Sequence, residues 1–224
     1  MLQPTVIVLH GLARTARSMR RLATAMEEGG LRPLNLDYPS RKHTIQELAQ
    51  QLVPFIENEV DSEVPLHLVS HSMGGLVGRV LMSLLPNHNW QNAVFIAPPH
   101  NGSHLARRLS NHPATQPFFH WFYGPAGKQV AQEKPELPLP PCPFGVVAGT
   151  KARALANPIS WFSHTVLEQP SDGTVYVEET HLEMMVDFVE IPANHTTIMN
   201  QSDVHAMVLH FFEHGAFPPQ STQE

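Results

Sequence analysis

The chain contains 224 residues, of which 42% are hydrophobic, so it is long enough to bury one sizeable core without disulfide or metal support. Its formal net charge of −6 argues against a general nucleic-acid binder, and its single cysteine, Cys142, excludes an intramolecular disulfide. The N-terminus carries no basic leader, cleavage site or bilayer-spanning apolar run, which favours a cytoplasmic protein. We expect a single domain over residues 1–224.

The first part of the chain alternates apolar runs with an amphipathic segment. Residues 5–9 and 31–36 are predicted to be β-strands. Between them, apolar side chains recur at helical spacing and stop at the pair Gly29 and Gly30, which predicts a helix. Its apolar positions are Met19, Leu22, Ala23 and Met26. The basic residues interpreted as its solvated face are Arg14, Arg17, Arg20 and Arg21.

A second helix is expected after Thr44, because Thr44 and Glu47 form a capping-box pattern ahead of helically spaced apolar residues. Pro54 is expected to kink this helix. Further strands are predicted at four apolar runs, which are residues 64–69, 92–97, 144–148 and 186–191. Two more helices are predicted, at residues 73–85 and 204–211.

This order of elements predicts an α/β fold, with a mostly parallel central sheet of about six strands and helices on both faces. Residues 100–143 break the pattern, since they carry an aromatic run at 118–123 followed by a proline-rich run. A connection of this length inside a compact domain is usually functional, so we interpret the insertion as a lid or an acyl-binding wall. The alternative is an ordinary excursion whose aromatic side chains pack on the sheet.

The residues that follow the strand at 64–69 form the most informative motif. The sequence Ser-His-Ser-Met-Gly-Gly at 70–75 leads from this strand into a helix, which is the pattern of a nucleophile elbow. A tight strand-to-helix turn exposes the hydroxyl of its central serine, so Ser72 is the expected nucleophile. The positions two before and two after the nucleophile must be small. Ser70 and Gly74 meet this requirement, although glycine is usual at the first of them.

A nucleophilic serine needs a base and a group that orients the base. Asp172 lies in a turn with Gly173 between two predicted strands, and His195 follows the last strand, so both are expected at the carboxyl edge of the sheet. The order Ser72, Asp172, His195 is the order in which α/β-hydrolases carry their triad. Alternative acids are Asp37, Asp187 and Asp203, and alternative bases are His164, His181 and His205.

Two backbone N–H groups are expected to stabilise an oxyanion. One belongs to Met73, which follows the nucleophile, and the other to Leu12, in the loop after the first strand. His10, Gly11 and His71 are expected to line the substrate site beside them. A structural role in the elbow is the other interpretation of His71.

Together these segments resemble the α/β-hydrolase superfamily, and within it the compact bacterial lipases and lipase-like esterases. The matching segments are residues 8–12, 70–75, 97–103, 171–175 and 194–196. The resemblance implies that Ser72 is the nucleophile, that His195 is general base and then acid, and that Asp172 orients His195. It also implies that Leu12 and Met73 donate to the oxyanion.

The resemblance further implies that residues 101–103 form a turn that shapes the pocket. No cofactor is required for this chemistry. No metal is expected either, because the 15 histidines show no His-Glu-x-x-His spacing.

The sequence therefore predicts a serine carboxylesterase or small lipase that acts on a small-molecule or lipid ester through an acyl-enzyme. A weak contact with a membrane surface through the aromatic insertion is part of this expectation. A thioesterase or acyltransferase would use the same residues. The remaining alternative is a binding module on the same fold without catalysis.

Overall fold

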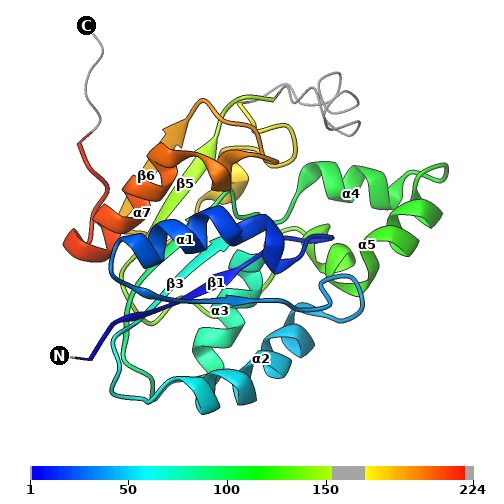
Figure 1. Ribbon diagram of the computed structural model, residues 1–224. Helices are drawn as coiled ribbons and strands as arrows, with labels where there is room; N and C mark the ends of the chain where they lie inside the picture. Colours follow the sequence, from blue (N-terminus) through cyan, green and yellow to red (C-terminus); the bar gives the residue numbers. More distant parts are fainter. Residues whose placement is uncertain (1, 153–169, 220–224) are drawn as a thin grey trace, which may run out of the picture.

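The computed structural model describes residues 2–152 and 170–219, and they build one parallel β-sheet with helices on both faces (Figure 1). The six strands are β1 (Thr5–Leu9), β2 (Arg32–Leu36), β3 (Leu66–His71), β4 (Trp90–Ile96), β5 (Phe144–Gly149) and β6 (Asp187–Ile191). Their order is β2-β1-β3-β4-β5-β6, and every adjacent pair is parallel. The strand order changes direction between β1 and β3, where open parallel sheets place their sites.

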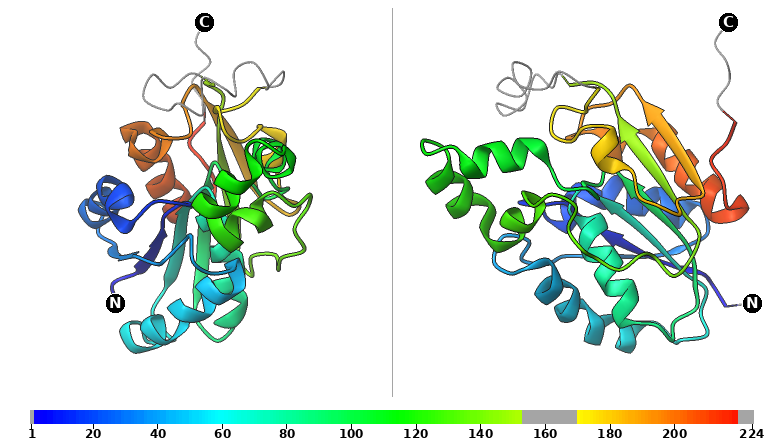
Figure 2. Two further views of the ribbon diagram at one scale, coloured as in Figure 1. Left: turned by 90° about the vertical axis from the view of Figure 1, so that its right-hand side faces the viewer. Right: turned by 180° about the vertical axis from the view of Figure 1, so that it is seen from behind.

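Helices pack on the sheet in two layers (Figure 2). The α-helices are α1 (Arg20–Glu28), α2 (Ile45–Glu59), α3 (Gly74–Leu84), α4 (His104–Asn111), α5 (Gln116–Val130) and α7 (Ser202–His214). In β1, Val6 and Val8 pack in the core cluster formed with α1 and α7, whereas Ile7 and Leu9 pack in the cluster formed with α2 and α3. Successive side chains of a strand point to opposite faces, so a fully apolar strand serves both layers.

The predicted α/β fold is confirmed, with small shifts at the ends of elements. β1 has the expected bounds, but β3 begins two residues later and extends to His71, and all six of its residues are buried. α2 begins after the predicted capping box, in which Thr44 accepts from the Glu47 N–H and Glu47 accepts from the Thr44 N–H. Pro54, which was expected to kink this helix, lies inside it, and α2 continues to Glu59. Within the described ranges, no helix has the length and apolar character needed to cross a membrane.

The insertion at residues 100–143 forms α4, α5 and an extended return segment. Both helices lie beyond the carboxyl ends of the strands (Figure 1). α5 is broken at Gly124, which has a positive φ of 63°, and a Cβ there would lie 1.8 Å from the carbonyl oxygen of Arg41. The return segment is held by α3, because the buried Arg79 donates to the carbonyl oxygens of Leu137 and Pro138. Arg41, in the loop between β2 and α2, donates from Nε to the carbonyl oxygen of Phe122 in α5. The insertion is therefore anchored both to the β2–α2 loop and to α3.

Candidate active site

Ser72 lies on a sharp turn between β3 and α3. Its φ is +55°, a backbone region that non-glycine residues seldom occupy and that often marks functional sites. The turn is fixed by a hydrogen bond from the Ser72 N–H to the carbonyl oxygen of Ile96 at 2.9 Å. A Cβ at Gly74 would lie 2.7 Å from the carbonyl oxygen of His10, so only glycine lets α3 approach β1 this closely. This geometry presents the Ser72 hydroxyl at the carboxyl edge of the sheet.

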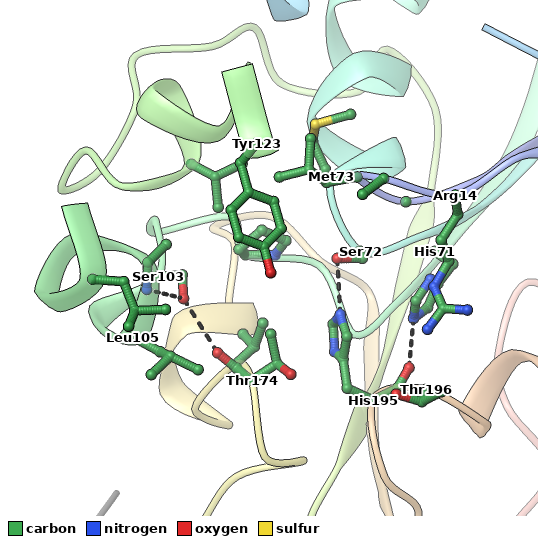
Figure 3. A pocket seen from close by; sticks show the side chains of 18 of the residues that line it. Arg14, His71, Ser72, Met73, Ser103, Leu105, Tyr123, Thr174, His195 and Thr196 are labelled. Atoms are coloured by element: carbon green, nitrogen blue, oxygen red, sulfur yellow. Dashed lines mark hydrogen bonds between the residues drawn. The ribbon is translucent and has the colours of Figure 1, made fainter. Parts of the chain in front are cut away.

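The structure brings Ser72, His195 and Asp172 into one hydrogen-bonded chain (Figure 3 shows the first link). Ser72 Oγ lies 2.9 Å from His195 Nε2, and His195 Nδ1 lies 2.6 Å from Asp172 Oδ2. A carboxylate only accepts, so Nδ1 carries the proton and Nε2 is free to accept the serine proton. The Asp172 side chain is almost fully buried, which shields its hydrogen bond with His195 from water.

Asp172 is held in place by its own turn after β5. Its second carboxylate oxygen accepts the N–H groups of Thr174 and Val175 at 3.0 and 2.9 Å. Its carbonyl oxygen accepts the His195 N–H at 2.9 Å, which joins the acid loop to the loop after β6. Gly173 has a φ of +92°, so this tight turn requires glycine. Asp172 and His195 are thus positioned relative to each other by backbone as well as by side chains.

The alternative acids lie elsewhere. Asp37 is exposed and contacts His10 and the Ala16 N–H, and Asp187 accepts the Phe217 N–H. Asp203 lies in the first turn of α7.

The alternative bases do not approach the serine either. His181 stacks on Phe188, and His205 Nε2 contacts the carbonyl oxygen of Met199. His164 lies outside the described residues.

The loop after β1 lies against the elbow. A Cβ at Gly11 would lie 3.0 Å from Ser72 Cβ, so a larger residue at this position would press on the serine. The loop is fixed by the Ala13 N–H, which donates to Ser40 Oγ at 3.1 Å. Within the part of the chain that the structure describes, neither the Leu12 nor the Met73 N–H donates to another residue. Both N–H groups are therefore unpaired within these residues, and Leu12 and Met73 line the same cavity as Ser72.

His10 and His71, both expected to line the substrate site, have different surroundings. His10 is buried, stacks on Tyr38 with ring centroids 4.0 Å apart, and accepts the Tyr38 hydroxyl at its carbonyl oxygen. It does not line the cavity, whereas Gly11 and His71 do. Burial lowers the pKa of the His10 imidazole. We therefore assign His10 to the support of the loop.

His71 contacts the backbone of His195. Its Nε2 lies 2.9 Å from the carbonyl oxygen of His195, so Nε2 carries the proton and donates. Burial first, and then the neighbouring His195, holds the pKa of His71 well below its ordinary value. A neutral His71 therefore fixes the His195 backbone without adding a charge beside the reacting imidazole.

Ser72 and His195 open into a cavity of about 410 Å³ (Figure 3). The insertion supplies its apolar wall, which consists of Leu105, Ala106, Leu109, Phe119, Phe122, Tyr123 and Val130. Two further aromatic side chains of α5 point to solvent, since Phe118 is 59% and Trp121 is 73% exposed. The aromatic residues of the insertion therefore divide between the cavity and the surface.

The turn at residues 101–103 connects this apolar wall to the loop that contains Asp172. Gly102 has a φ of +81°, and Ser103 caps α4 while its hydroxyl donates to the carbonyl oxygen of Thr174 at 3.2 Å. Buried Glu179 makes a second connection, because it accepts the N–H groups of His104 and Tyr176. Burial raises the pKa of the Glu179 carboxyl to about 7. The start of α4 and the loop that carries Asp172 are thus coupled.

The sequence interpretation of Arg14 is wrong. Arg14 was expected on the solvated face of a helix, but α1 begins at Arg20 and a short 3₁₀ helix begins at Ala16. Arg14 instead lies in the loop after β1 and lines the cavity. The one signal in the sequence is that Arg14 lies two residues after Leu12, because a loop expected to supply an oxyanion donor is also expected to border the substrate.

Cys142 does not compete with Ser72 as a nucleophile, and the described ranges hold no metal cluster. Burial raises the pKa of the Cys142 thiol to about 12, so it is not a thiolate at neutral pH. In the same residues, no group of three His, Cys, Asp or Glu side chains gathers as metal ligands.

Comparison with known proteins agrees with this geometry. The model of the alpha/beta hydrolase family matches residues 6–208. The chain therefore belongs to the α/β-hydrolase family.

Its curated relatives include the lysosomal thioesterase PPT2 of Mus musculus, which is 32% identical over 105 residues, or 44% of this chain and 35% of that protein. The human PPT2 is 31% identical over the same length. The match thus spans about a third of these relatives.

Two solved structures share the fold over most of both chains. The mature lipase BlEst2 of Bacillus licheniformis has a TM-score of 0.69 and 18% identity, with 88% of this chain and 87% of the lipase covered. The type II thioesterase BorB of borrelidin biosynthesis has a TM-score of 0.58 and 17% identity, with 94% and 91% covered. At these identities the likeness shows the fold alone.

Proposed function

We propose that this chain is a serine hydrolase that cleaves carboxylic esters through an acyl-enzyme. One observation carries the proposal, namely the hydrogen-bonded chain from Ser72 through His195 to the buried Asp172. This arrangement activates a hydroxyl that is otherwise a weak nucleophile. A non-catalytic binding module would have no need to hold all three side chains in this alignment.

In the first half of the reaction, Ser72 Oγ attacks the ester carbonyl while His195 Nε2 accepts the serine proton. The carbonyl oxygen becomes an oxyanion, which the N–H groups of Leu12 and Met73 stabilise. Met73 lies at the N-terminus of α3, where the helix dipole favours negative charge. Asp172 stabilises the imidazolium, which then protonates the departing alcohol and leaves the acyl group on Ser72.

In the second half, His195 accepts a proton from water, and the resulting hydroxide attacks the acyl-enzyme. The second tetrahedral intermediate uses the same two backbone donors. His195 then returns the proton to Ser72 Oγ, and the carboxylic acid leaves. No cofactor takes part in either half.

The insertion at residues 100–143 is proposed to cap the acyl group within a single domain of residues 1–224. Its seven apolar cavity residues provide a wall that a hydrocarbon chain would cover. The exposed Phe118 and Trp121 are proposed to make a weak contact with a membrane surface that supplies a lipid ester. The cytoplasm is the proposed compartment, since the free Cys142 suits a reducing environment.

Thioester hydrolysis is the second candidate, because the PPT2 proteins that match 44% of this chain are thioesterases by name. The same triad and the same oxyanion donors would serve, since only the leaving atom changes from oxygen to sulfur.

A series of 4-nitrophenyl esters and matching acyl thioesters with two to sixteen carbons tests both candidates. We expect ester hydrolysis whose kcat/KM rises with chain length until the cavity is filled. Thioesters preferred at every length would favour the second candidate. A folded protein that hydrolyses neither series would contradict the proposal.

A further inference from the structure

Arg14 borders the reacting groups, although the proposed reaction does not use it. It lines the same cavity as Ser72 and His195, from the loop that also carries Leu12. The backbone of this loop is fixed at two points. Ala13 has a φ of +56° and donates its N–H to Ser40 Oγ, and the Arg14 N–H donates to the carbonyl oxygen of Gly11 at 3.3 Å. These contacts therefore fix the backbone from which the Arg14 side chain extends into the cavity, two residues from the proposed oxyanion donor Leu12.

The charge of Arg14 is not balanced within the cavity. Of the described residues that line the cavity, Arg14 is the single lysine or arginine, and none is an aspartate or glutamate. Among the hydrogen bonds and ion pairs of the described residues, none involves the Arg14 guanidinium. Asp37, which follows β2, contacts His10 and the Ala16 N–H instead. Asp172 is committed to His195.

This cation is also partly removed from water. Burial lowers the pKa of the Arg14 guanidinium, and its charge contributes to the low pKa of His71. A partly desolvated cation without a counterion is costly, so a bound anion would be strongly favoured at this place. The net charge of the chain is −6, yet Arg14 is positive and the described cavity residues include no aspartate or glutamate. The cavity should therefore favour an anionic group over a neutral one.

The position of Arg14 indicates which part of the substrate would carry the anion. Figure 3 shows Arg14 beside His71 and Thr196 on one side of the Ser72–His195 pair, and Leu105 and Tyr123 on the other side. The apolar side suits the acyl chain. With the acyl chain on that side, the alcohol or thiol would extend towards Arg14, beyond the His195 imidazole that would protonate it.

We propose that Arg14 is a specificity-determining residue that binds a phosphate or carboxylate group on the leaving alcohol or thiol of the substrate. This inference rests on the proposed function and deepens it, because it names the substrate class of the same site. Arginine suits such a group, since its planar guanidinium makes two parallel charge-assisted hydrogen bonds with either anion.

Two matched pairs of monomeric esters test the proposal. Octanoylglycerol phosphate is compared with octanoylglycerol, and the octanoyl ester of glycolic acid with that of glycolamide. The wild type is expected to prefer the anionic member of at least one pair by roughly tenfold or more in kcat/KM. Arg14→Gln is expected to reduce this preference to about one, and Arg14→Lys to retain part of it. Arg17→Gln, at an exposed position in the following 3₁₀ helix, is the matched control and should keep the wild-type ratio.

Three outcomes would overturn the proposal. The first is a wild type that hydrolyses the neutral esters without any preference in either pair, which leaves the proposed function intact. The second is an Arg14→Gln variant that loses activity equally on both members of a pair, as expected of a purely structural residue. The third is an Arg14-dependent preference for 4-nitrophenyl hemisuccinate over 4-nitrophenyl butyrate, with no preference in either of the two matched pairs. That result would place the anion on the acyl side. If no ester is hydrolysed and a fluorophosphonate does not label Ser72, the proposed function itself fails, and the role of Arg14 falls with it.

Discussion

His195→Ala is expected to lower kcat on a short 4-nitrophenyl ester by about 10⁴-fold or more, because Ser72 then has no base within reach. Nε2 of His195 lies 2.9 Å from Ser72 Oγ, and no other described imidazole bonds to this hydroxyl. The residual rate would come from the oxyanion donors and substrate binding alone. Steady-state kinetics with a folded variant, verified by circular dichroism, measures the effect.

The matched controls are His181→Ala and His205→Ala, which replace the two described histidines considered as alternative bases. Both side chains contact other groups, so their loss should leave kcat within a few-fold of wild type. A His195→Ala variant with near-wild-type kcat would show that His195 is not the base. Loss of activity in a folded His181→Ala variant would point to that histidine instead.

Asp172→Asn is expected to lower kcat by about 10⁴-fold while the fold is retained. The amide oxygen can still accept the N–H groups of Thr174 and Val175. The amide nitrogen then faces His195 Nδ1 as a donor, which favours the tautomer with its proton on Nε2. In that tautomer, His195 cannot accept the proton of Ser72. Measurement of kcat together with the midpoint of thermal unfolding separates this effect from lost stability.

Asp37→Asn is the control for the acid, because Asp37 also leaves a strand at the carboxyl edge but contacts His10 and Ala16. It should retain most of the activity. The assignment of the acid would be wrong if Asp172→Asn kept near-wild-type kcat while Asp37→Asn lost it.

The elbow was predictable because its constraints are local. Strand, turn and helix follow one another within residues 64–85, and the small residues required around Ser72 are visible in the sequence. To predict that Asp172 and His195 lie near Ser72, one more rule was needed, namely that the loops after parallel strands meet at one edge of the sheet. The structure places both within hydrogen-bond distance of their partners, as that rule requires.

The shape of the insertion and the position of Arg14 were not predictable in this way. Which aromatic side chains face the cavity depends on how α4 and α5 pack over the sheet, and no short-range pattern encodes that packing. Arg14, Arg17 and Arg20 are all basic and lie close together in the sequence, so the pattern predicted that all three belong to the solvated face of one helix. In the structure, Arg17 lies in the 3₁₀ helix and Arg20 begins α1, whereas Arg14 lies in the loop before both.

The most direct test of the central claim is covalent labelling of the folded protein by a fluorophosphonate, read by mass spectrometry of the peptide that contains Ser72. The wild type is predicted to form one adduct, on Ser72, because His195 activates this hydroxyl. Ser83→Ala, a change on the outside of α3, should label like the wild type, and Ser72→Ala should not label. A folded wild type without an adduct, or an adduct that persists in Ser72→Ala, would contradict the assignment of Ser72 as the nucleophile.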